Sequence, residues 1–172
     1  RVVMHYVTTL PQRKGPEEQN AIGFAAATSA CEKAKCWRSA LRLVEQMHQL
    51  GFAPYIFSIN AALSALEKVG AWLPALRMFQ QMPMWRLVAT ETTYSAVISA
   101  CEKARKLAPQ LLLLRRSEKA GVIAYNAVLV TCRALLCWSL ALELLDVMVQ
   151  ERLAVNPVTL EPIVDVLQSQ QQ

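Results

Sequence analysis

The sequence contains little of the material from which catalytic and metal sites are built. Among its 172 residues there are two histidines, His5 and His48, and neither stands at ligand or general-base spacing from another candidate residue. The cysteines form no Cys-x-x-Cys pair, and the His-x-Glu and Pro-Cys-x-x-Cys motifs of zinc deaminases are absent. We therefore expect no enzyme activity, no metal site and no cofactor.

Long uncharged runs are also absent. Charged residues make up 18% of the chain and apolar residues 54%, yet the most apolar stretch, 128–149, still contains Arg133, Glu143 and Asp146. Burying these charges in lipid would cost several kcal/mol, so we exclude a membrane span there. The net charge of +5 permits an anionic partner but does not require one.

What the sequence does contain is an internal repeat. The pentapeptide Ala-Cys-Glu-Lys-Ala occurs at Ala30–Ala34 and at Ala100–Ala104, and a related copy, Ala65–Val69, lies midway. The period is therefore 35 residues, within the range typical of solenoids built from stacked supersecondary units. Aromatic and sulfur-containing residues keep the same register: Trp37, Trp72 and Trp138, and Met47, Met82 and Met148.

The register divides the chain into four units, 21–55, 56–90, 91–121 and 122–156. A degenerate end of a preceding unit, 1–20, comes before them, and a partial unit or capping helix, 157–172, follows. The third unit is four residues shorter than the others, so we predict the weakest junction there. The chain begins with Arg1 rather than Met, and we expect it to be part of a longer repeat array.

Each unit is predicted to form two helices. In the second unit, apolar residues at helical spacing predict helices over Asn60–Lys68 and Ala75–Met82, with a break at Gly70. Pro74, and Pro109 at the same place in the third unit, fit the first turn of the second helix, where a missing N–H costs nothing. The pattern predicts an all-α solenoid.

Helix ends are predicted from glycine and proline. Gly51 and Gly121 stand where the second helices of their units are expected to end, the usual place of a left-handed C-cap glycine. Pro83 follows Met82 directly, and we expect it to end that helix.

The cysteines recur in register and are interpreted as packing residues. Cys31, Cys101 and Cys132 share one repeat position, which Leu66 fills in the second unit, so this position is predicted to lie in the core. Cys36 and Cys137 share another position. We expect no disulfide among these residues, which suits a reducing interior.

A helix–turn–helix unit of this length resembles the pentatricopeptide repeat (PPR). The matching segments are 40–47, 94–104 and 125–129, together with the Gly-x-x-Pro joint at 51–54. The tetratricopeptide repeat has a period of about 34 residues and a Trp-x-x-Leu-Gly-x-x-Tyr core that this chain lacks. The resemblance implies a right-handed α-solenoid whose first helices carry single-stranded RNA at one base per repeat.

The resemblance also places base-reading side chains, at the fifth and last residues of each unit. The pairs are Ala25 with Tyr55, Asn60 with Thr90, Ser95 with a disrupted end, and Asn126 with Asn156. Asparagine at both positions implies pyrimidine reading with cytosine preferred, because an amide both donates and accepts hydrogen bonds. Asn60 with Thr90 is similar to a weaker pyrimidine reader. Ala25 cannot hydrogen-bond, so the first unit is expected to read poorly.

A second set of positions, three residues before each reader, forms one wall of a base sandwich in the family. Here these positions hold Ile22, Phe57, Thr92, Ile123 and Val158. Phe57 offers an aromatic plane on which a base can stack. The alternative is that these residues pack neighbouring units together, and for Ile22 and Val158 both interpretations stay open.

Basic residues recur eight positions after the readers. Lys33, Lys68 and Lys103 are in register, and Arg133 stands next to Ala134, which fills that position in the fourth unit. Such a stripe could follow RNA phosphates. The alternative is a solvated charged edge, because Glu32, Glu67 and Glu102 stand beside the lysines.

Two functions are compatible with these features. The first is a single-stranded RNA-binding module acting on organelle transcripts in processing, stability, editing or translation, with a plastid or mitochondrial location implied by the resemblance. It would prefer a pyrimidine at the fourth repeat. The second is a helical scaffold that binds protein partners without sequence-specific RNA recognition. Neither function involves a membrane.

Overall fold

The computed structural model describes residues 17–52, 54–117, 120–157, 159–161 and 164, and side chains from residue 23 onward. It confirms the all-α prediction: the described residues form helices and connecting turns, with no strand among them. In chain order the elements are α2 (Glu17–Lys33), α3 (Trp37–Gln49), α4 (Ile56–Lys68), α5 (Trp72–Gln81), the 3-10 helix η1 (Met82–Trp85), α6 (Glu91–Lys103), α7 (Leu107–Arg116), α8 (Val122–Leu135) and α9 (Trp138–Gln150).

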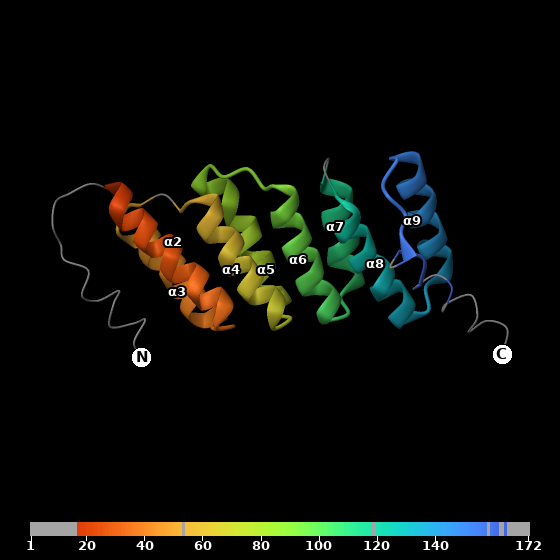
Figure 1. The fold of residues 1–172 in the computed structure, drawn as a ribbon, viewed down its shortest axis with the longest axis horizontal. Coiled ribbons are helices and arrows are strands. Elements are labelled where there is room, and N and C mark those ends of the chain that lie inside the picture. The colour runs from red at the N-terminus through yellow and green to blue at the C-terminus, as the bar shows by residue number, and fades with distance from the viewer. Residues whose placement is uncertain (1–16, 53, 118–119, 158, 162–163, 165–172) are drawn as a thin grey trace.

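The helices are stacked along one axis in chain order, from α2 at one end to α9 at the other (Figure 1). Each first helix contacts the next first helix, so that α2, α4, α6 and α8 form one continuous layer. Each second helix packs against the first helix of its own unit, and α3, α5 and α7 also pack against the first helix of the following unit. This nearest-neighbour arrangement is the solenoid that the repeat predicts.

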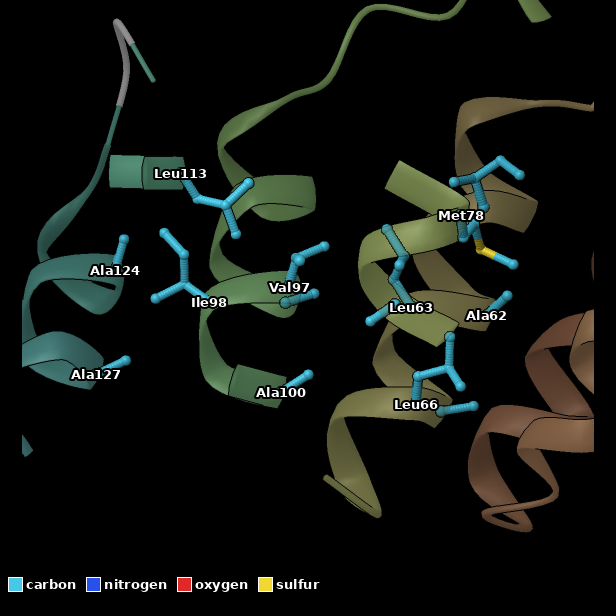
Figure 2. Close-up of a cluster of buried hydrophobic side chains, with 14 of the residues drawn as sticks. Ala62, Leu63, Leu66, Met78, Val97, Ile98, Ala100, Leu113, Ala124 and Ala127 are labelled. Atoms are coloured by element: carbon cyan, nitrogen blue, oxygen red, sulfur yellow. The ribbon is translucent and has the colours of Figure 1, made fainter. Parts of the chain in front are cut away.

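One apolar core runs through the stack, because the first helices present apolar side chains to both neighbours. In Figure 2, Val97 and Ala100 point from α6 toward α4, while Ile98 points the opposite way, toward α8. Val97, Ile98 and Ala100 are all fully buried. A first helix of this kind can be apolar on two sides, because each of these sides is covered by a neighbouring unit.

Left-handed turns recur inside the units at positions that glycine alone does not mark. Between the two helices of each unit lies one residue with positive φ: Lys35 (54°), Gly70 (68°), Arg105 (53°) and Leu136 (57°). Each turn is closed by the N–H of the following residue. In the first unit, Cys36 N donates to Cys31 O at 2.9 Å, and the equivalent bonds elsewhere are 2.9–3.0 Å long. These bonds are Schellman caps, which satisfy the last carbonyls of a helix.

The joints between units follow the same rule in three cases. Gly51 (φ 78°), Arg86 (55°) and Arg152 (55°) are left-handed, and the next residue donates to the carbonyl of a buried methionine. The methionines are the in-register series Met47, Met82 and Met148, which are at most 1% exposed. The left-handed cap predicted at Gly51 is therefore confirmed.

The equivalent prediction for Gly121 is wrong. Gly121 has φ −80° and ψ 172° and forms the N-cap of α8, not the C-cap of the preceding helix. The preceding helix, α7, ends at Arg116. Gly121 thus corresponds to Tyr55 and Thr90, which cap α4 and α6. The four missing residues of the third unit come from the end of its second helix and its joint, so no left-handed cap is required there.

The prolines lie as predicted, but the second helices begin earlier than the apolar pattern indicated. Pro74 and Pro109 occupy the third positions of α5 and α7, within the first turn. Because the first turn needs no N–H at these positions, α5 begins at Trp72 rather than at Ala75. After α5 ends at Gln81, Pro83 lies within η1, so the helix tightens there before it stops.

The shortened unit places a polar side chain in the core. Gln110 is fully buried where the other units have the buried residues Ala40, Ala75 and Ala141. Its Nε2 donates to the carbonyl oxygens of Ile98 (3.2 Å) and Ala127 (3.5 Å), while its Oε1 is buried without a partner. The third unit therefore keeps its packing at the cost of one unsatisfied carbonyl.

The register cysteines are core residues, as predicted. Cys31, Cys101 and Cys132 are no more than 3% exposed, whereas Cys36 is exposed and Cys137 is half-buried. Burial raises the pKa of the Cys101 thiol to about 11 and that of Cys132, where Cys137 contributes further, also to about 11. Both thiols are therefore protonated at neutral pH and unreactive as nucleophiles.

None of the helices in the described part of the chain is long and apolar enough to span a membrane.

Candidate nucleic-acid interface

The predicted readers lie near the starts of the first helices. Asn60, Ser95 and Asn126 are each the fifth residue of α4, α6 and α8. Asn60 and Asn126 are half-buried and Ser95 is 9% exposed. The predicted partners Tyr55, Thr90 and Asn156 are exposed, and Tyr55 and Thr90 are the N-caps of α4 and α6. The helices α4 and α6 thus begin directly after the last residue of the preceding unit.

The structure joins the Asn60 and Thr90 pair through a third residue, Thr93. The Thr93 hydroxyl donates to Asn60 Oδ1 at 2.8 Å, and it accepts the Thr90 N–H at 3.0 Å. The Thr90 and Thr93 hydroxyl oxygens are also 3.0 Å apart, and Thr93 N donates to Thr90 Oγ1 at 3.4 Å. Thr93 is fully buried, so these bonds form away from water.

This network has a defined direction of hydrogen bonding. A hydroxyl carries one proton, and that of Thr93 goes to Asn60, so Thr90 must be the donor in the contact between the two hydroxyls. Asn60 is left with its amide N–H groups available, and Thr90 with acceptor capacity. The second unit therefore presents one donor and one acceptor at its predicted reading position.

The Asn126 and Asn156 pair is arranged differently. Thr159, the in-register counterpart of Thr93, donates to Asn156 Oδ1 through its hydroxyl (3.0 Å) and through its backbone N–H (3.0 Å). Because that hydroxyl proton goes to Asn156, Asn126 receives nothing from it, and Asn126 Oδ1 is buried with no hydrogen-bond partner. The fourth unit thus keeps an unsatisfied acceptor where the second unit has a satisfied one.

The first and third units each lack one half of this arrangement. Ser58 occupies the Thr93 position between the first and second units, but Ala25 offers it no acceptor, and the buried Ser58 hydroxyl has no partner. In the third unit Ser95 is present, but the cap is Gly121 and the hydroxyl position holds Ala124. The expectation that the first unit reads poorly is consistent with the first of these two gaps.

The residues of the predicted base sandwich that the structure describes are exposed. Phe57 is 61% exposed and Ile123 is 64% exposed, and Thr92 is also on the surface. Large apolar side chains that packed neighbouring units together would be buried, so the exposure of Phe57 and Ile123 favours a surface role for both. Ile22 and Val158 lie outside the described side chains.

The predicted lysine stripe is bound into ion pairs between units. Lys68 Nζ lies 2.9 Å from Glu32 Oε1, and Lys103 Nζ lies 3.4 Å from Glu67 Oε1. Ser64 also donates to Glu32, at 2.9 Å. Lys33 and Arg133 are exposed. Lys68 and Lys103, both assigned to phosphates, therefore have carboxylate partners, as the alternative of a solvated charged edge requires.

The pairs Glu32–Lys68 and Glu67–Lys103 form an ion-pair ladder between units. The pKa values of acidic residues along this ladder differ from their ordinary values. Burial acts to raise the pKa of Glu32, but the hydrogen bonds from Lys68 and Ser64 outweigh it and hold that pKa below its ordinary value. Glu102 has the opposite shift: burial and the charge of Glu67 raise its pKa, against the lowering effect of Lys103. The ladder ends at Glu102 because Ala134 stands where the next lysine would be.

Sequence reasoning missed the hydroxyl position that links the readers. Ser58 and Thr93 are separated by one period and occupy the third residue of α4 and α6. Their recurrence in register was a detectable signal. Its meaning depends on which carbonyl lies opposite each hydroxyl, and this appears only when neighbouring units are stacked.

The site offers hydrogen-bonding groups, exposed apolar surface and cations, but no reactive group. The described residues contain no cluster of three or more histidine, cysteine or acidic side chains that could hold a metal ion. What the arrangement can do is present a short row of donors and acceptors beside exposed side chains suited to stacking.

Comparison with known proteins identifies the repeat and the fold. Residues 28–52 match the family model for the PPR repeat. No curated protein matches the sequence significantly. Among solved structures, the PPR domain of Arabidopsis thaliana protein-only RNase P 1, crystallised with tRNA, superposes with a TM-score of 0.75 at 15% identity, over 84% of this chain and 78% of that domain.

Two further structures are similar over most of this chain. PPR10 in complex with an 18-nucleotide psaJ RNA element has a TM-score of 0.72 at 21% identity, over 98% of this chain and 25% of PPR10. Nuclear proteinaceous RNase P 2 from A. thaliana has a TM-score of 0.78 at 12% identity, over 92% of this chain and 36% of that protein. The chain therefore spans a quarter to about a third of these two proteins, and the shared feature is the helical-repeat fold.

Proposed function

We propose that this chain is a pentatricopeptide repeat protein and a single-stranded RNA-binding module that contacts one base per repeat along its first helices. Two of the structural neighbours were crystallised with RNA. The observation that carries the proposal is the pair of polar sites at the starts of α4 and α8. Asn60 is linked to Thr90 through Thr93, and Asn126 occupies the same helix position in α8, while Phe57 and Ile123 are exposed nearby in the sequence.

The fourth unit should select a pyrimidine, with cytosine preferred. Asn126 Oδ1 is buried and unpartnered, and an unsatisfied buried acceptor costs free energy until a donor reaches it. The amino group of cytosine is such a donor, and a turn of the half-buried Asn126 side chain would bring its acceptor to the surface. Filling this vacancy would contribute affinity that a base without a donor at that place cannot supply.

The test is a polarisation titration of the chain against short C-rich, U-rich and A-rich single strands. We expect tighter binding to the pyrimidine strands, and an Asn126→Ala variant should lose that preference by roughly two- to tenfold. Ser58→Ala, which removes an unpartnered hydroxyl beside the unit that lacks a reader, serves as the control and should leave the pyrimidine preference unchanged. Equally weak binding to all three strands, unaltered by Asn126→Ala, would refute the reading site.

Salt dependence gives an independent check on the phosphate contacts. If three of Lys33, Lys68, Lys103 and Arg133 contact phosphates, log K against log salt should slope by roughly −2 for a single strand. Because Lys68 and Lys103 are paired with Glu32 and Glu67, a slope near zero would indicate that the ladder stays closed when RNA binds.

The action on organelle transcripts belongs to the same proposal and rests on the family alone. Tagging the full-length protein and imaging it against plastid and mitochondrial markers tests the location. Sequencing the RNA that co-purifies from that compartment tests whether transcripts are bound there.

The second candidate function, a protein-binding scaffold, is favoured by one surface feature. A hollow of about 350 Å³ lies between α7 and α9, with Leu111, Leu114 and Leu144 in its lining and Arg115 and Glu143 beside them. Partner capture that survives nuclease treatment and is lost on Leu144→Asp would support this function over RNA binding.

A further inference from the structure

A buried hydroxyl recurs beside the predicted readers, and it belongs to neither of the two reading residues of a repeat. It belongs to the third residue of the following first helix: Ser58 after the first unit and Thr93 after the second, with Thr159 after the fourth. All three residues are fully buried. A buried hydroxyl needs a partner. Thr93 donates to Asn60 and Thr159 donates to Asn156, whereas the Ser58 hydroxyl has no partner.

We propose that Thr93 is a specificity-determining residue, which holds the Asn60 carbonyl so that the Asn60 amide N–H groups face the RNA base. The inference rests on the proposed RNA-binding function and names the residue that sets the reading polarity of its second repeat. Thr93 itself makes no contact with the base, because it lies fully buried beneath Asn60 and Thr90.

The geometry explains why the amide needs to be held. An asparagine amide can turn over and exchange its donor for its acceptor, so by itself it can pair with either kind of base atom. The 2.8 Å bond from the Thr93 hydroxyl to Asn60 Oδ1 stabilises one of the two orientations. Selection between bases depends on the polarity of the groups presented to them, so an amide that turns freely discriminates little.

The other units behave as the same rule requires. Where Ala25 replaces the reader, the Ser58 hydroxyl has no partner. Where Asn156 takes the hydroxyl of Thr159, the Asn126 carbonyl has none. Among the described residues, the Asn60 amide is thus held by a hydroxyl and the Asn126 amide is not, while the Ser58 hydroxyl has no amide to hold.

The experiment is a selection from a pool of random short single strands by the 172-residue chain, followed by sequencing to obtain a base preference for every position. Thr93→Val keeps the shape of the side chain and removes the hydroxyl. It should flatten the preference at one position by about three- to tenfold and leave the other positions unchanged. Thr93→Ser keeps the hydroxyl and should retain the wild-type motif.

Ser58→Ala is the matched control, because it removes the hydroxyl at the same place in a unit without a reader. It should leave the motif unchanged. Ala25→Asn supplies the missing acceptor and should add one selected position, which the double variant Ala25→Asn with Ser58→Ala should lose again.

The outcomes separate this inference from the function on which it rests. A folded Thr93→Val variant with the wild-type motif would overturn the role of Thr93 and leave RNA binding intact. A wild-type chain that selects no motif would overturn the proposed function, and this inference with it. Because the Thr93 side chain completes the capping box of α6 with Thr90, folding of each variant is verified by circular dichroism at the selection temperature.

Discussion

The junction between the second and third units and the junction between the third and fourth units share one core but not one surface. At the first, Arg86 forms a left-handed joint, Thr90 caps α6 and Thr93 binds Asn60. At the second, α7 ends at Arg116, Gly121 is the cap and Ala124 replaces the hydroxyl. Loss of four residues has thus removed a whole set of polar features together.

The two junctions differ in their polar features but not in their apolar contacts. Val97 and Ile98 are both fully buried although they point to opposite junctions (Figure 2). Stacking therefore depends on the faces of the first helices, whereas the polar site depends on the residues that enter each helix. A repeat can lose its capacity to recognise a ligand while it continues to support its neighbours.

The largest expected effect tests whether the two junctions are equally well packed. Leu63→Ala on α4 and Ile98→Ala on α6 each remove a fully buried side chain and should each lower the free energy of unfolding by about 2–5 kcal/mol. Urea denaturation measures both. A loss below about 1 kcal/mol for Ile98→Ala alone would show that the shortened unit is loosely packed. The two junctions would then not share one equally well-packed core.

The next effect contrasts two glycines. Gly70 has φ +68° and lies beside Lys103, to whose Cβ an added methyl would approach within 3.2 Å, so Gly70→Ala should cost about 1–2 kcal/mol. At Gly121 the backbone is extended and an added Cβ would meet only the carboxylate end of the Glu91 side chain, which can turn away. Gly121→Ala should cost less than about 0.5 kcal/mol. Equal losses in thermal denaturation would contradict this assignment of Gly121 as a cap.

A smaller effect comes from the buried glutamine of the short unit. Gln110→Met keeps the volume and removes the unpartnered Oε1, at the loss of two hydrogen bonds from Nε2. We expect a change within about 1 kcal/mol and in the stabilising direction, because the backbone carbonyls of Ile98 and Ala127 remain bonded within their helices. A loss well above about 2 kcal/mol would mean that the hydrogen bonds by which Gln110 bridges α6 and α8 stabilise the fold more than its unpartnered Oε1 destabilises it.

The smallest effect concerns the two ends of the ion-pair ladder and depends on pH. The pKa of Glu32 is lowered in the folded chain, so its contribution to stability is present at neutral pH and lost as pH falls through that lowered value. The pKa of Glu102 is raised, so its contribution has the opposite sign: stability falls as pH rises through the raised value.

Because the pKa shifts of Glu32 and Glu102 have opposite signs, one substitution at each residue gives a matched pair of variants. At pH 7, Glu32→Gln should destabilise the chain by up to about 0.5 kcal/mol and Glu102→Gln should stabilise it by a similar amount, since both groups are partly exposed. Both differences should shrink in urea titrations at acidic pH. A destabilising Glu102→Gln would show that the ladder continues past Ala134.

Much of the fold follows from the sequence because the repeat supplies a register. The pentapeptide and the methionine series locate the helices, the buried cysteines and the left-handed Gly51. Gly121 was misassigned because a glycine fits both a left-handed cap and an N-cap, and the choice depends on where α7 ends. That end is determined by packing at the shortened unit, which a period cannot reveal.

The candidate site was less predictable for a related reason. The positions of Asn60 and Asn126 follow from the register, but the partner of each amide does not, because Thr93 binds a residue 33 positions earlier. Likewise, the lysine stripe was visible in the sequence, whereas the pairing of Lys103 with Glu67 depends on the stacking of α6 against α4.

The left-handed turns have a consequence for the basic character of the chain. In the part of the chain that the structure describes, four of the five non-glycine residues with positive φ are cationic: Lys35, Arg86, Arg105 and Arg152. Each lies one or two residues beyond a helix C-terminus, where the backbone carbonyls carry partial negative charge. A positive side chain there offsets part of the strain of the turn. Four of the 18 lysines and arginines thus stand just beyond helix ends, where their charge favours the termination of helices within the chain itself.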